Sequence, residues 1–231
     1  MAKIVHLRLA EQIWDTGDET DAGVDIILGP IKLRAAEYTD VNTMAAATTL
    51  FSGQARPAVL STDDTLLNQD NWQLRDLAFT YIHTGGTIVI IPMVGSNGVY
   101  IEEFVVKLGL PWVEKQIGRR DFSVNSAFRR FSVSSIRGYS CGSKAMHLED
   151  VAREDSLLIS PRNWVYRSDV PPGGHELDRF RDDEEEAAAK VEKHYVAAAL
   201  AGVGQGRVGY VAECFGDADA VNVVLGMLGM L

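Results

Sequence analysis

The stretch AVLSTDDTLLNQDNWQLRDLAFTYIHTGGTIVIIPMVGSNGVYIEEFVVKLGLPW, residues 58–112, decides the fold. It opens with a short apolar run that ends in the polar cluster 61–64, which predicts a buried strand with a polar carboxyl end. Apolar residues then recur at helical spacing over residues 72–82. Gly85 and Gly86 end that helix, because glycine readily adopts the left-handed conformation that follows a helix.

A second strand and a second helix follow. Residues 87–91 are apolar and β-branched almost throughout, as in a strand of a parallel sheet that is covered on both faces. After Pro92 and a glycine-containing turn, residues 101–110 are helical again. This pattern predicts an α/β protein, a three-layer Rossmann-like (flavodoxin-like) sandwich with a mainly parallel central sheet. Ligands of such sheets bind beyond the carboxyl ends of the strands, here residues 62–65 and 93–97.

Composition and charge exclude several classes of protein. A chain of 231 residues with 46% hydrophobic and 23% charged residues predicts a single α/β domain over residues 1–231. The net charge of -10 argues against a nucleic-acid partner. No apolar run reaches the roughly 18 residues of a membrane span, and Met1 to Lys3 lead into a strand without the apolar region of a signal peptide. We therefore expect a cytoplasmic protein without a membrane partner.

No metal or cofactor is expected from the sequence. The acidic residues within 10–30 lack the ligand order of a calcium-binding EF-hand, so we interpret this segment as a solvated loop. Cys141 and Cys214 form neither a disulfide framework nor a metal-type spacing. The glycines of residues 202–206 resemble a dinucleotide fingerprint only superficially, because a strand follows them where the fingerprint needs a helix.

The remaining segments complete the predicted domain. Residues 31–38 are the expected second strand, since Gly29 and Pro30 break the weak helical pattern before them. His6, inside the first strand, is expected to be a hydrogen-bonded structural residue rather than a ligand. The other predicted elements are a capped helix over 44–51, strand-like pieces over 116–133, a strand over 157–159, a hairpin of 196–200 with 207–211, and a final helix over 220–231.

Two further segments are a predicted insertion and a carboxyl-terminal segment with two possible roles. Residues 169–193 are rich in acidic residues and follow a proline- and glycine-rich loop, which indicates a surface insertion within the domain. The apolar carboxyl-terminal segment 221–231 either contributes to an isologous homodimer or packs against its own sheet.

Several motifs carry a resemblance to a known family. They are Gly85–Val89, Phe104 with Leu108–Trp112, Lys144–Leu148, Val151–Asp155 and Val203–Val211. Together they resemble an uncharacterised fungal family of the ThuA-like, class I glutamine amidotransferase-like superfamily, from Pro57 onward. The resemblance implies the same three-layer fold but no particular reaction.

The chain departs from this superfamily where function would be sought. In amidotransferase relatives the turn after the second strand holds a nucleophilic cysteine, whereas residues 92–96 contain none. ThuA-like relatives carry a histidine near the end of the same strand, and this chain lacks it. Residues 213–215 read Glu-Cys-Phe where the fungal family has Asp-Val-Asn. Amidotransferase and cysteine protease chemistry are therefore not expected.

Two hypotheses follow for the function. The first is an acid/base isomerase, lyase, cyclase or hydrolase of specialised small-molecule metabolism. The second is a non-catalytic member of the fold that binds a small molecule or has a structural role. They are distinguished by whether the candidate acid/base groups converge on one concave site with a perturbed carboxylate.

The candidate site residues lie at the predicted strand ends and near the carboxyl terminus. Asp63 is a candidate base or hydroxyl anchor, and the alternative is that it caps the following helix. His147 is the candidate proton-transfer partner, and the alternative is that it braces a loop. The remaining candidates are catalytic Ser96 and Glu213 and ligand-binding Thr62, Met93 and Gly95.

Overall fold

The computed structural model describes residues 2–9, 19–92, 101–118, 121–136, 139–140, 145–160, 163–166, 190–212 and 218–231. Its centre is one mixed sheet whose first half is parallel, in the order β2-β1-β3-β4-β13. The strands of this half are β1 (Lys3–Leu7), β2 (Glu37–Val41), β3 (Ala58–Ser61), β4 (Thr87–Ile90) and β13 (Gly206–Val211). The predicted strands β3 and β4 are neighbours, as the single helix between them implies.

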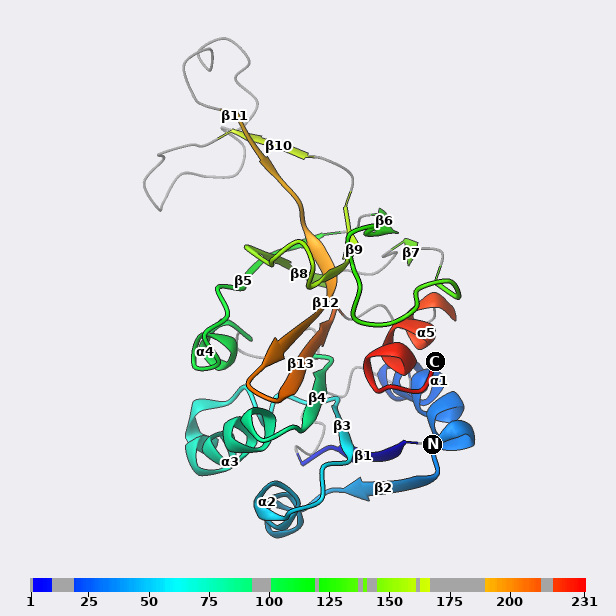
Figure 1. Ribbon diagram of the computed structural model, residues 1–231, viewed down its shortest axis with the longest axis vertical. Coiled ribbons are helices and arrows are strands. Elements are labelled where there is room, and N and C mark those ends of the chain that lie inside the picture. The colour runs from blue at the N-terminus through cyan, green and yellow to red at the C-terminus, as the bar shows by residue number, and fades with distance from the viewer. Residues whose placement is uncertain are drawn as a thin grey trace.

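Helices cover both faces of the parallel half, which gives three layers (Figure 1). Helices α2 (Met44–Ser52) and α3 (Trp72–His83) pack together on one face. A short 3-10 turn, η1 (Gln69–Asn71), precedes α3. Helices α1 (Glu19–Arg34) and α5 (Ala218–Met227) pack together on the other face. The α/β fold class with a mainly parallel mixed sheet is therefore confirmed.

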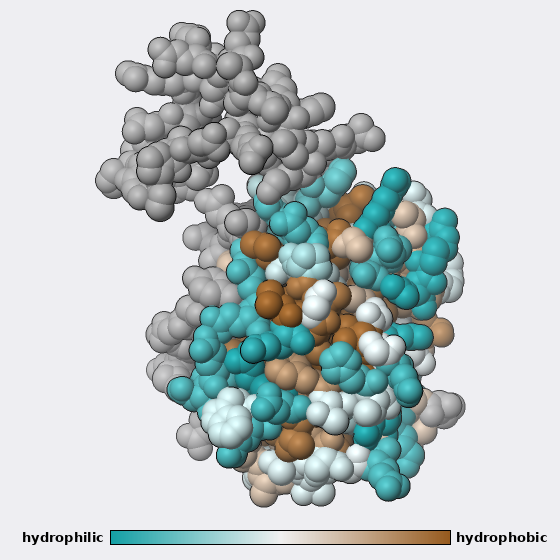
Figure 2. All heavy atoms as spheres, turned by 60° about the vertical axis from the view of Figure 1, so that its left-hand side comes forward, coloured by the Kyte–Doolittle hydropathy of each residue, from teal (hydrophilic) through white to brown (hydrophobic). Residues whose placement is uncertain are grey.

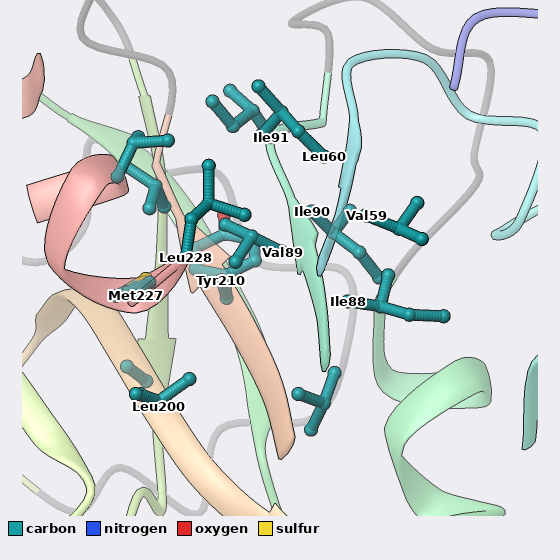
Figure 3. Close-up of a cluster of buried hydrophobic side chains, with 14 of the residues drawn as sticks. Val59, Leu60, Ile88, Val89, Ile90, Ile91, Leu200, Tyr210, Met227 and Leu228 are labelled. Carbon is teal, nitrogen blue, oxygen red and sulfur yellow. The ribbon is translucent and has the colours of Figure 1, made fainter. Parts of the chain in front are cut away.

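The core lies between these layers and is mainly aliphatic, with buried aromatic rings such as Phe51 and Tyr81. Val59, Ile88 and Val89 are fully buried in neighbouring strands, and Leu228 packs towards them from the end of α5 (Figure 3). Fully burying a side chain of this size stabilises the fold by about 1.5–3 kcal/mol. The near-continuous apolar sequence of β4 is explained by burial on both faces of the sheet.

Helix α1 corrects two predictions made from the sequence. Residues 19–34 are helical through Pro30, so residues 10–30 are not all loop and residues 31–34 are not strand. The reason is a buried stripe at helical spacing, formed by Val24, Ile27, Leu28 and Ile31. Burying these four side chains outweighs the cost of about 3 kcal/mol for an internal proline. The second strand consequently begins later, at Glu37.

The second half of the sheet is antiparallel. Strand β12 (Val196–Val203) pairs with β13 on one side and with β8 (Ala145–Glu149) and β9 (Ser156–Ile159) on the other. Strand β5 (Val113–Gly118) pairs with β8, and β6 (Asp121–Val124) lies between β9 and β7 (Tyr139–Ser140). A separate ribbon joins β10 (Asn163–Tyr166) to β11 (Lys190–Lys193), and β11 is the part of the predicted insertion 169–193 that the structure describes.

The predicted glycine-rich hairpin between β12 and β13 holds the two halves together. Gly204 adopts a φ of 59°, which a side chain would strain. A Cβ added to Gly206 would lie 2.2 Å from the carbonyl oxygens of Gly86 and Ile82. The hairpin can therefore dock on the α3–β4 turn only because this position lacks a side chain.

Three features of the helices concern membrane or protein partners of this chain. Within the described ranges, no helix combines the length and the apolar character needed to cross a lipid bilayer. The apolar face of α5 is buried within the chain, in agreement with the second alternative for residues 221–231, and the homodimer stays a prediction. Helix α4 (Ile101–Val106) ends in the exposed Val106, and apolar atoms reach the surface amid polar ones on that side of the molecule (Figure 2).

Candidate functional site

Asp63 follows β3 at the carboxyl edge of the parallel half and is tied to its surroundings. Its Oδ2 accepts hydrogen bonds from the backbone N–H of Leu9 and from the hydroxyl of Thr65 at 3.0 Å. Its Oδ1 accepts the backbone N–H of Thr65 at 3.1 Å. Asp63 is only 5% exposed. The carboxylate therefore fastens the loop after β3 to the chain that leaves β1.

Thr62, a predicted ligand-binding residue, belongs to a hydrogen-bonded chain across three strands. Its hydroxyl lies 2.8 Å from Nε2 of His6, and Nδ1 of His6 lies 2.9 Å from Oδ1 of Asp40. Because a carboxylate only accepts, Nδ1 carries the proton towards Asp40 and neutral Nε2 accepts the Thr62 hydroxyl. The Tyr38 hydroxyl also donates to Asp40, at 2.8 Å.

The hydrogen-bonded series Thr62–His6–Asp40 has the order hydroxyl, imidazole, carboxylate that activates nucleophiles in hydrolases. Thr62 and His6 are, however, only 3% and 5% exposed, so a substrate has little access to the hydroxyl. Burial lowers the pKa of His6, and its bond to Asp40 offsets this only in part. His6 therefore acts as the structural residue expected from the sequence, and it joins β1 to β2 and β3.

His147 lies in β8 rather than in a loop and is fully buried. Its ring packs against Phe122 at a centroid distance of 4.9 Å and lies 6.3 Å from the ring of Tyr195. Strands β4, β13 and β12 lie between β3 and β8 in the sheet. At about 4.8 Å per strand, Asp63 and His147 are roughly 19 Å apart along the sheet. The structure does not bring these two candidates together.

The other candidates lie outside the described residues. These are Ser96, Glu213, Met93 and Gly95, together with both cysteines. Their roles stay predictions.

A carboxyl group with a shifted pKa, which the sequence did not predict, lies near the carboxyl edge of the parallel strands, as Asp63 does. Glu114 of β5 is 9% exposed, and its Oε2 accepts the backbone N–H of Ile101 at 3.0 Å. Burial raises the pKa of Glu114, and the Ile101 bond offsets only part of that effect. The negative charges of Glu102 and Asp64 raise it further, and a side-chain hydrogen bond with Tyr210 lowers it. The raised pKa makes Glu114 a candidate proton donor among the described residues of this edge.

A cavity of about 720 Å³ lies in the antiparallel half, and Asp63, His147 and Glu114 are not among its lining residues. Its lining comes from β6, the β8–β9 turn, β9 and the start of β12. Among the described residues, its charged or titratable side chains are Glu149, Asp150, Arg153 and His194, and several serines add hydroxyl groups. The sequence interpretation did not single out these residues. Only the antiparallel pairing of distant segments brings them together.

The floor of this cavity is held by internal hydrogen bonds. The side-chain amide of Asn125 donates to the carbonyl oxygens of Arg153 at 2.7 Å and Ser156 at 2.9 Å, and its oxygen accepts the N–H of Ala127. The Ser160 hydroxyl accepts the N–H of Tyr195 at 3.1 Å. The cavity is therefore built on a fixed backbone. Among the described residues, no group of three or more His, Cys, Asp or Glu side chains could hold a metal ion.

Comparisons with known proteins identify the fold and no family. No family model and no curated protein matches the sequence. The fold is similar to a β-galactosidase from the Antarctic haloarchaeon Halorubrum lacusprofundi, with a TM-score of 0.53 and 14% identity. It is also similar to the GH42 β-galactosidase Gan42B from G. stearothermophilus, with a TM-score of 0.51 and 10% identity for a catalytic mutant.

These structures match all of this chain, which spans only 30% of each of theirs. The likeness supports an α/β fold of the class I glutamine amidotransferase-like type, which the resemblance in the sequence implied. At such low identity it shows the fold alone. The ThuA-like family membership stays a prediction.

Proposed function

We propose that this chain is a non-catalytic member of the class I glutamine amidotransferase-like fold that binds a small polar molecule. The binding site is the cavity between β6, β8, β9 and β12, and not the carboxyl edge of the parallel strands. This is the second of the two functions that the sequence left open, with a different site.

One observation carries the proposal. The two candidate catalytic groups that the structure describes, Asp63 and His147, are separated by three intervening strands. Asp63 accepts bonds from two backbone N–H groups and a hydroxyl, which is what a structural carboxylate does. General acid/base catalysis needs its groups within hydrogen-bonding reach of one substrate. This separation favours binding over catalysis by that pair.

The cavity supports the positive part of the proposal. Its volume lies within the roughly 300–1,000 Å³ of small-molecule sites. It combines charged groups with the half-buried apolar side chains of Val124, Val151 and Ile159. Such a mixture can orient a small polar molecule through a few polar contacts while its apolar part lies against these side chains.

Equilibrium dialysis of the purified protein against a small-molecule extract tests the proposal. We expect compounds to be retained at no more than one per chain and to be recovered with unchanged mass. In Ser126→Trp, an indole on the exposed wall of the cavity should displace the ligand and abolish retention. Ser134→Trp, at an exposed serine outside the cavity, is the matched control and should retain as the wild type does.

Two outcomes contradict the proposal. One is that no compound is retained, or that Ser126→Trp retains as much as Ser134→Trp. The other is that a new compound accumulates in molar excess over the protein, because a non-catalytic binder cannot produce it.

Glu114 favours the acid/base enzyme as a second candidate function. Burial raises the pKa of Glu114, so this carboxyl group keeps its proton to a higher pH than an exposed one and can serve as a general acid. Glu114→Gln keeps an oxygen for the Ile101 N–H and removes the acid. If the dialysis reveals a product, its formation should fall by roughly a hundredfold or more in this variant. Unchanged turnover in a folded Glu114→Gln protein would exclude this residue as the acid.

A further inference from the structure

Two opposite charges on the lip of the cavity have no partner within the described part of the chain. Asp150 and Arg153 are both exposed and both line the cavity. The described residues give neither side chain an ion pair or a hydrogen bond. This contrasts with Arg130 and Asp155 close by, whose guanidinium and carboxylate pair at 2.6 Å.

The backbone that carries these charges is held in place. Asp150 and Arg153 belong to the same turn between β8 and β9, and Asp150 has a φ of 55°. The N–H groups of Asp155 and Ser156 both donate to the carbonyl oxygen of Ala152 at 3.0 Å. The Arg153 carbonyl accepts the Asn125 amide. A fixed turn therefore presents two charges, three residues apart, that no other described residue pairs with.

The other lining groups restrict the charge of a ligand. Glu149, only 5% exposed, adds a second carboxylate, so the described lining residues hold two acidic groups, one guanidinium and the imidazole of His194. A ligand with only negative charge would be repelled by Glu149 and Asp150. A ligand with only positive charge would leave Arg153 unpaired and facing a cation. A molecule with one ammonium and one carboxylate matches both charges of the lip.

We infer that the cavity binds a free amino acid as its zwitterion, with the ammonium at Asp150 and the carboxylate at Arg153. The side chain of the amino acid lies on the apolar patch of Val124, Val151 and Ile159. This inference rests on the proposed function and adds the class of ligand. It predicts that an aliphatic amino acid binds more tightly than glycine, because it covers more of the patch.

Calorimetric titration with L-leucine tests the inference. The probes that remove one charge are N-acetyl-L-leucine, which lacks the ammonium, and L-leucinamide, which lacks the carboxylate. L-leucine should bind, and each blocked form should bind roughly tenfold or more weakly, since a charge-assisted hydrogen bond is lost. Glycine should also bind more weakly than L-leucine.

Variants locate the two charges. Arg153→Gln should weaken the binding of L-leucine roughly tenfold but leave the binding of L-leucinamide unchanged, because the amide has no carboxylate to pair with the guanidinium. Asp150→Asn should weaken the binding of L-leucine roughly tenfold and leave the binding of N-acetyl-L-leucine unchanged, because that compound has no ammonium group. Asparagine also tolerates the positive φ of this position. Glu154→Gln removes an exposed charge of the same turn that does not line the cavity, and should change nothing.

The outcomes separate this inference from the proposed function. If extract compounds are retained in the cavity but L-leucine neither binds nor competes with them, the ligand class is wrong and the binding function stands. L-leucine binding that Arg153→Gln and Asp150→Asn do not weaken also overturns the inference. If nothing is retained and L-leucine does not bind, both fail.

Discussion

The two halves of the sheet use polar side chains in different ways. In the parallel half, Asp63, Thr62, His6 and Asp40 bind one another or nearby backbone N–H groups, and most of them are buried. In the antiparallel half, Asp150 and Arg153 face a cavity and have no partner within the described residues. The carboxyl edge, where this fold commonly binds ligands, is here stabilised by internal bonds.

The difference shows that residue type and position in the fold do not suffice to identify a site. An aspartate after a parallel strand is a plausible base until its lone pairs are found to be occupied. A buried polar group with all its bonds made contributes to stability, and its loss leaves other groups unsatisfied. An exposed charge without a partner on a fixed backbone is available to a ligand. Four predictions test this contrast.

The largest effect is expected at Asp63. Asp63→Ala leaves the N–H groups of Leu9 and Thr65 without their acceptor, and should lower the free energy of unfolding by about 3 kcal/mol. Asp70→Ala, at an exposed neighbouring aspartate, should change it by less than about 0.5 kcal/mol. Urea denaturation measures both. Equal, small effects would mean that the carboxyl edge does not depend on this aspartate.

The reverse pattern is expected at Arg153. Because its side chain has no partner within the described residues, Arg153→Gln should leave the free energy of unfolding within about 0.5 kcal/mol of the wild type. The same variant should make the binding free energy of L-leucine less favourable by about 1.4 kcal/mol, which is a tenfold loss of affinity. Denaturation and calorimetry on one preparation give both values. A loss of stability without a loss of affinity would assign Arg153 a structural role.

The His6 network should make stability depend on pH. Burial lowers the pKa of His6 in the folded chain below the value of about 6.5 expected when unfolded. The unfolded chain therefore binds the proton more readily as the pH falls. The contribution of His6 is complete above about pH 6.5 and is lost below it, with a slope of at most about 1.4 kcal/mol per pH unit.

His6→Gln provides the reference for this pH dependence. The variant lacks the titrating group, so the difference in unfolding free energy between it and the wild type should shrink as the pH falls from about 7.5 to about 5.5. Subtracting the variant removes the contribution of other groups, including Glu114, whose raised pKa acts with the opposite sign. A difference that stays constant or grows would show that His6 is not disfavoured in its charged form.

The smallest effect is expected for an exposed ion pair in the parallel half. Lys3 Nζ and Glu37 Oε2 are 2.6 Å apart, with both side chains more than half exposed. Glu37→Gln should cost about 0.3 kcal/mol of unfolding free energy, and less at about 1 M salt. A cost comparable to that of Asp63→Ala would mean that burial does not distinguish structural from incidental polar contacts in this half.

The fold could be predicted where the apolar pattern was unambiguous. Residues 87–91 and the hairpin segments form strands as expected, because their apolar runs are buried in the centre of the sheet. Helix α1 was missed because Gly29 and Pro30 were given more weight than the buried stripe around them. That error shifted the second strand, and Asp40 was therefore not recognised at a strand end beside His6.

The candidate sites were harder to predict, for a physical reason. The bonds of Asp63 depend on Leu9, which is distant in sequence, and on the register of β1 against β3. The cavity depends on β12 pairing with β9 across a long stretch of chain. Neither pairing leaves a local pattern, whereas a strand or a helix does. Arg153 was noticed only within a family motif, without a role.

The most direct test of the central claim is an amide NMR titration of the ¹⁵N-labelled protein with L-leucine. If the ligand binds in the antiparallel half, shifts should concentrate in residues 123–126 and 149–153 and leave residues 62–65 and 101–105 unchanged. Shifts concentrated at Thr62 to Thr65 and at the start of α4 would instead place the ligand at the carboxyl edge. That result, or the absence of any shift, would contradict the account.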